Sequence, residues 1–132
     1  MVDFLALIDR VMSPPEPVNI WSLNKEPRVK CLLLQLAEQL GRSEWYIDQT
    51  ARTNREAVYL IHKDERDLRA YLHIHGQHEG RAGLHLEFPR VADRGPTYEA
   101  YEDLSIQQLV DMLAAHFGVS QIAPEPAFGA AE

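Results

Sequence analysis

The chain has 132 residues, a formal net charge of −7, 45% hydrophobic residues and a single cysteine. This length is enough for one hydrophobic core, the lone cysteine excludes an internal disulfide, and the acidic balance argues against nonspecific binding to nucleic-acid phosphates. No apolar segment reaches the ~20 residues that cross a bilayer and no basic leader is visible, so we expect a cytoplasmic protein without a membrane partner.

Two helices are expected in the first third of the chain. Residues 3–12 show a short amphipathic pattern that a proline-rich stretch ends. A stronger pattern covers residues 27–40, where Pro27 suits the first helical position and Gly41 suits the position after the last turn. The leucines of this segment form a wide apolar stripe, so the helix should be largely buried, and Cys31 is expected to pack within it.

Four strands are expected to follow, over residues 45–51, 57–62, 68–75 and 84–88. Each is rich in β-branched, aromatic or aliphatic residues, and short polar segments separate them. Short links between successive strands are typical of an antiparallel meander. Pro89 and the polar segment after it are expected to end the sheet.

A last helix is expected over residues 106–117. Ser105 and Gln108 have the spacing of a capping box at its start. The predicted fold class is therefore α+β: a four-stranded antiparallel β-meander that is packed on one face by helices 27–40 and 106–117, with the short N-terminal helix beside them.

We expect one α+β domain over residues 1–119 and a flexible tail over residues 120–132. The core should combine leucines from both long helices with leucines from the apolar face of the sheet. The predicted core leucines are Leu32, Leu33, Leu36, Leu60, Leu72, Leu86, Leu109 and Leu113.

The negative charge is concentrated in the last part of the chain. Residues 93–132 contain seven acidic residues and one basic residue, whereas the rest of the chain is nearly neutral. The simpler interpretation is a solvated region that only aids solubility. The charge is also compatible with a basic protein partner, which Glu99, Glu102 and Asp103 would then attract.

Four of the six histidines fall in the third and fourth strands and the loop between them. Alternation places the apolar side chains of these strands on one face and the histidines on the other. If the apolar side chains of the two strands meet, His73 lies opposite His85 and Tyr71 lies opposite Glu87. Opposed side chains are ~5 Å apart at Cβ, so a histidine pair is predicted on the face away from the core.

This second face is too aromatic for a surface that only meets water, and it lacks the apolar density of a core. Such a surface is typical of recognition, by a protein partner or by a second copy of the chain. The candidate partner-binding residues are Tyr59, Arg69, Tyr71, His73, His75, His85, Glu87, Glu99, Glu102 and Asp103.

The simplest interpretation of these histidines is a structural or merely solvent-exposed role, and a metal site is weaker than either this or a partner contact. His73, His75, His85 and Glu87 offer ligands that zinc accepts, but their spacing matches no established metal motif. No nucleophile motif, phosphate loop or catalytic carboxylate pair is present. We therefore assign no catalytic residue, no metal ligand and no cofactor.

The predicted function is that of a small acidic binding or regulatory protein, comparable in size and charge to inhibitors, immunity proteins and chaperones. It would act by protein–protein contacts and without catalysis. The alternative is a small-molecule or metal-binding domain, or an enzyme, that uses the histidine-bearing face. An RNA platform built from Tyr46, Tyr59 and Tyr71 is disfavoured by the acidity of the chain.

Overall fold

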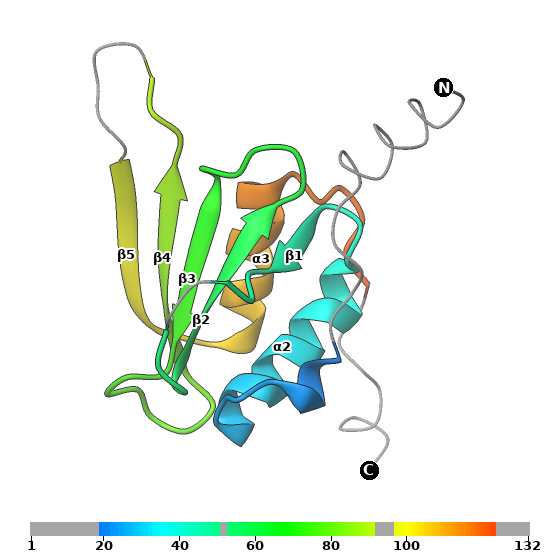
Figure 1. The fold of residues 1–132 in the computed structure, drawn as a ribbon. Coiled ribbons are helices and arrows are strands. Elements are labelled where there is room, and N and C mark those ends of the chain that lie inside the picture. Colours follow the sequence, from blue (N-terminus) through cyan, green and yellow to red (C-terminus); the bar gives the residue numbers. More distant parts are fainter. Residues whose placement is uncertain (1–18, 51–52, 92–96, 124–132) are drawn as a thin grey trace.

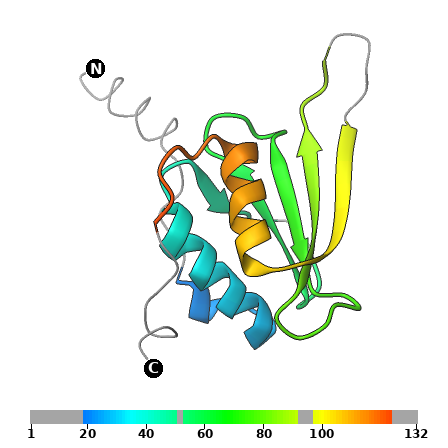
Figure 2. The ribbon, with the colours of Figure 1, turned by 180° about the vertical axis from the view of Figure 1, so that it is seen from behind.

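The computed structural model describes residues 19–50, 53–91 and 97–123. In this part of the chain, two α-helices pack on one face of an antiparallel sheet (Figures 1 and 2). The elements are η1 (Ile20–Ser22), α2 (Pro27–Leu40), β1 (Trp45–Ile47), β2 (Ala57–His62), β3 (Arg69–His73), β4 (Ala82–Phe88), β5 (Thr97–Leu104) and α3 (Ile106–Phe117).

The α+β class and the antiparallel meander are confirmed, but the sheet has five strands instead of four, in the order β1-β2-β3-β4-β5. The expected helix over residues 3–12 lies outside the described residues. So does most of the expected tail, and the domain boundary at residue 119 stays a prediction. Neither α2 nor α3, the long helices of the described part, is long and apolar enough to span a membrane.

The fifth strand was missed because it carries no apolar periodicity. Its first seven residues are all exposed. Figure 2 shows why: β5 stands at the edge of the sheet beyond α3, so neither of its faces is fully covered. A strand that buries neither face has no reason to alternate apolar and polar residues, and alternation is the main sequence signal of a strand.

Both long helices have the predicted bounds. Pro27 opens α2, and the Gly41 N–H donates to Ala37 O at its end with a φ of 69°. At the start of α3, the Ser105 side chain accepts the Gln108 N–H, and the Gln108 side chain accepts the Ser105 N–H. This capping box satisfies two backbone donors that have no partner within the helix.

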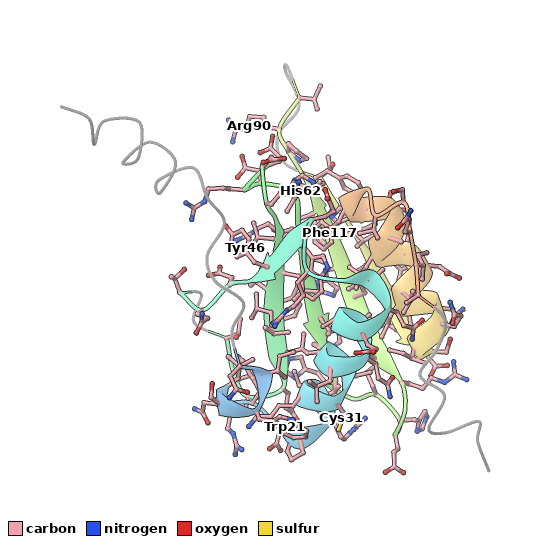
Figure 3. All side chains as sticks on the ribbon, turned by 90° about the vertical axis from the view of Figure 1, so that its right-hand side faces the viewer. Trp21, Cys31, Tyr46, His62, Arg90 and Phe117 are labelled. Atoms are coloured by element: carbon pink, nitrogen blue, oxygen red, sulfur yellow. The ribbon has the colours of Figure 1, made fainter. Side chains whose placement is uncertain are left out.

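The core lies between the helices and the inner face of the sheet, and seven of the eight predicted leucines are buried in it. Leu32 is only partly buried. Cys31 is exposed in the N-terminal half of α2 (Figure 3). At 100° per residue, Cys31 points away from buried Val29 and Leu33, so the expectation that it packs in the core was wrong.

The predicted register between β3 and β4 is wrong by two residues. Tyr71 pairs with His85 instead of Glu87, and His73 pairs with Gly83. A shift of two keeps every side chain on its predicted face, because side chains alternate with a period of two. Apolar alternation therefore specified the faces correctly but could not distinguish the two registers.

Candidate functional site

The sheet face opposite α2 and α3 holds most of the predicted site residues, and we call it the open face. The strand register arranges its side chains in rows across the sheet. The first row comprises Tyr46, Ile61, Arg69, Glu87 and Tyr98, and the second comprises Tyr59, Tyr71, His85 and Ala100. The third row comprises Ala57, His73 and Gly83, and Glu102 and His75 lie beside it.

Tyr71 is at the centre of a cluster of rings on the open face. Its ring centroid lies 5.1 Å from that of Tyr59, 5.4 Å from His85, 5.7 Å from His73 and 6.4 Å from His75. These separations lie within the range in which aromatic rings attract one another. The five predicted residues therefore form one contiguous surface.

His73 is the buried member of this cluster, with an exposed fraction of 5%. Its ring lies over Gly83, where a Cβ atom would overlap the imidazole. The backbone N–H of His75 donates to His73 Nδ1 over 3.1 Å, and His73 Nε2 lies 3.4 Å from Glu102 Oε2. Since Nδ1 accepts, the neutral ring carries its proton on Nε2 and directs it toward Glu102.

The same surroundings keep His73 neutral. Burial lowers its pKa, and the neighbouring His75 and His85 lower it further, while Glu102 partly offsets these effects. Adding a second ring proton at Nδ1 would also place it against the donating N–H of His75. His73 is therefore held as an uncharged hydrogen-bonding group near neutral pH.

His73, His85 and Glu102 bring three potential metal-ligand atoms within 4.8 Å of one another. The tautomer of His73 opposes metal binding, however. A histidine that binds a metal through Nε2 normally donates its Nδ1–H to an acceptor. Here Nδ1 is itself an acceptor, so a metal at Nε2 would require the ring to lose its hydrogen bond to the His75 N–H.

A second chain of hydrogen bonds runs from Tyr71 to Glu56. His75 Nδ1 lies 3.0 Å from Glu56 Oε1 and donates to that carboxylate, which leaves Nε2 to accept the Tyr71 hydroxyl over 3.2 Å. The order hydroxyl–imidazole–carboxylate resembles that of a nucleophilic triad. Burial raises the pKa of Tyr71, though, so its hydroxyl stays protonated and acts as a hydrogen-bond donor.

Arg69 and Glu87 form an ion pair beside the ring cluster. Arg69 Nε and Nη2 both donate to Glu87 Oε1, at 2.9 and 2.7 Å. The Arg69 guanidinium lies 4.3 Å from the centroid of the Tyr59 ring. Burial raises the pKa of Tyr59, and a hydrogen bond with Glu87 raises it further. The three side chains thus fix one another's orientation.

The three predicted acids of β5 lie in three different settings. Glu102 is on the open face, where its Oε1 accepts Gln77 Nε2 at 2.8 Å. Asp103 has a φ of 57°, and its N–H donates to Gln77 Oε1 at 2.7 Å. Glu99 is opposite Leu86, on the helix side of β5, and accepts the Tyr101 hydroxyl. Glu99 is therefore not part of the open face.

Four residues of this surface were not predicted from the sequence: Glu56, Gln77, Gly83 and Tyr98. Glu56, Gln77 and Gly83 lie in segments that were expected to be loops, and Tyr98 lies between the expected end of the sheet and the last helix. Gly83 belongs to β4, which begins two residues before the expected strand. Tyr98, whose ring lies 5.9 Å from His85, belongs to the strand that lacks apolar alternation.

Comparison with known proteins does not identify a relative. No protein-family model matches the chain, and neither curated proteins nor solved structures give a significant match.

Proposed function

We propose that the protein is a non-catalytic binding protein that recognises a basic protein partner through the open face and the adjoining strand β5. The observation that carries the proposal is the contiguous ring cluster around Tyr71, on a sheet face opposite both long helices. Tyrosine, histidine and arginine surfaces of this kind supply large contact areas with little loss of side-chain entropy, as in protein interfaces.

The charge distribution supports a basic partner. The chain carries a net charge of −7, and residues 93–132 account for −6 of it. On the open face, the positive charge of Arg69 is neutralised by Glu87, while Glu102 and Glu56 contribute further carboxylates. An acidic surface speeds encounter with a partner of opposite charge and suppresses binding to nucleic acid.

The hydrogen bonds of the cluster support binding more than catalysis. The Tyr71 hydroxyl and the His73 ring are held in neutral forms, and their polar atoms already have partners within the face. Ordered side chains of this kind lose little freedom when a partner binds, which favours affinity. A nucleophile or a general base would instead need a pKa near the working pH.

The test is site-specific photocrosslinking in an extract of the source organism. A photoreactive phenylalanine derivative replaces Tyr71 in one sample and Gln107, an exposed residue of α3, in the control. We expect one defined basic protein to crosslink from position 71 and not from position 107. The purified partner should then bind Tyr71→Ala and His85→Ala at least ~10-fold more weakly than the natural chain.

The metal-binding alternative predicts a different result. If His73, His85 and Glu102 hold zinc, added zinc should raise the melting temperature of the natural chain and leave His85→Gln unchanged. Equal crosslinking from positions 71 and 107, or an unchanged affinity of Tyr71→Ala, would refute the proposed use of the open face.

A further inference from the structure

β5 combines three features that together define a docking edge. It is eight residues long, it is the last strand in the sheet order, and its first seven residues are exposed. One backbone edge of β5 therefore faces away from β4, and no strand of the described residues pairs with it. Edge strands of this length are templates for pairing unless the protein blocks them with short length, proline or charge.

The side chains of β5 indicate which strand would pair with it. Glu99 projects on the helix side and Glu102 on the open face, so an added strand would meet a carboxylate on either face of the sheet. Tyr98 projects on the open face and Tyr101 on the helix side, and their exposed fractions are 67% and 37%. An added strand would therefore lie between tyrosine rings and carboxylates, a setting that suits the long aliphatic stems and charged ends of lysine and arginine.

A second copy of the chain fits this edge poorly. Antiparallel pairing of two β5 strands would bring Glu99, Glu102 and Asp103 of one copy alongside the same three acids of the second copy. Like charges that lie close together across a strand pair destabilise it. The acids thus oppose self-association while they favour a strand of opposite charge.

We propose that β5 binds an extended, lysine- or arginine-rich segment of a protein partner, which joins the sheet as an added edge strand. The end of the docking edge is set at Asp103, whose left-handed backbone and hydrogen bond to Gln77 turn the chain toward α3. The inference rests on the proposed function, since it specifies the chemistry and the conformation of the partner that the protein would recognise.

The test is an NMR titration of the ¹⁵N-labelled full chain with synthetic octapeptides. The probe alternates lysine and valine, one control alternates glutamate and valine, and a second control carries N-methyl groups on every other residue of the lysine peptide. We expect the lysine peptide alone to shift the amides of β5, and we expect its affinity to fall as salt screens the charges. N-methylation along the pairing edge should abolish the shifts, because it removes the donors of the added strand.

Two matched charge reversals locate the effect on the protein. Glu99→Lys and Asp111→Lys each change the net charge by +2, but Asp111 is an exposed residue of α3 and not part of β5. Glu99→Lys should weaken the lysine peptide about two- to tenfold, as loss and reversal of an exposed pair imply, and Asp111→Lys should change its affinity less than twofold.

The failures of the two proposals are distinguishable. Peptide shifts centred on Tyr71 and His85 instead of β5 would overturn the edge inference and agree with the proposed open-face function. Equal effects of both charge reversals, or no loss on N-methylation, would show that only general charge attraction acts. The absence of binding by the lysine peptide at millimolar concentration, or β5 shifts that depend on protein concentration without peptide, would also overturn the inference.

Discussion

The two faces of the same sheet are built on different principles. On the face under the helices, Leu60, Leu72 and Leu84 are fully buried, and their packing depends on the volume that each side chain fills. On the open face, the alternating neighbours Tyr59 and Tyr71 are half-buried and make directional contacts with rings and polar groups. Packing by volume tolerates exchange between similar side chains, whereas directional contacts depend on which residues are opposite one another.

This difference explains how the register of β3 and β4 is specified. The covered face accepts Leu72 opposite either Leu84 or Leu86, because the two leucines are equivalent in size. The open face does not accept both registers, because the ring of His73 occupies the space that a side chain at position 83 would need. We infer that His73 and Gly83 select the observed register, while the leucines supply most of the stability.

The largest effect should come from the covered face. Leu36→Ala and Leu72→Ala each remove a fully buried side chain and should lower the free energy of unfolding by ~2–5 kcal/mol. Urea unfolding followed by circular dichroism measures this loss. Leu32→Ala is the control, because partly buried Leu32 should lose less. A loss below ~1 kcal/mol at both buried positions would contradict the assignment of the core.

A smaller but more informative loss is expected from Gly83→Ala. The added methyl group would overlap the His73 ring, whose hydrogen bonds and burial resist displacement, so the cost should be ~1–3 kcal/mol. In a His73→Ala background the same substitution should cost much less, because the space is then free. Equal losses in both backgrounds would show that His73 and Gly83 do not specify the register.

The sequence predicted the covered face far better than the open face, for a physical reason. Helix caps, the α2 and α3 bounds and the inward leucines follow from local patterns, and all were correct except Leu32, which is only partly buried. The partners on the open face depend on register, which a period of two leaves ambiguous, and on β5, which has no apolar pattern to reveal it. Residues such as Tyr71 and His85 were therefore placed on the correct face but opposite the wrong partners.

Acid should destabilise the protein through His73. Its folded-state pKa is lowered by burial, so the unfolded chain binds this proton more readily, and stability falls as pH drops below the ordinary histidine value of ~6.5. Burial also lowers the pKa of His116, which adds to the effect. Urea unfolding between pH 7.5 and pH 5 should show a shallower loss for His73→Gln than for the natural chain.

Exposed His78, in the β3–β4 loop, provides the control for that measurement. His78→Gln should keep the pH dependence of the natural chain, because it leaves the buried His73 ring in place. If His73→Gln and His78→Gln gave the same pH dependence as the natural chain, the buried histidine would not be the group that senses acid.

The smallest expected effect tests whether directional contacts on the open face contribute to stability. Arg69 and Glu87 have side chains that are 34% and 25% exposed, and two nitrogens of Arg69 donate to one oxygen of Glu87. Lys63 and Glu44 form a matched pair at similar exposure, 32% and 31%, but with one contact at 3.4 Å. Double-mutant cycles isolate the coupling energy of each pair from the other effects of substitution.

We expect a coupling of ~0.5–1 kcal/mol for Arg69→Met with Glu87→Gln, and less for Lys63→Met with Glu44→Gln. The guanidinium donates twice and also stacks over Tyr59, whereas the ammonium of Lys63 is a point charge on a flexible stem. Added salt should weaken both couplings but leave more of the first, because stacking over a ring is screened less than an exposed charge pair. If the two couplings were equal at low and high salt, the geometry around Arg69 would add nothing to simple charge attraction, and the open face would then be an ordinary solvated surface in this region.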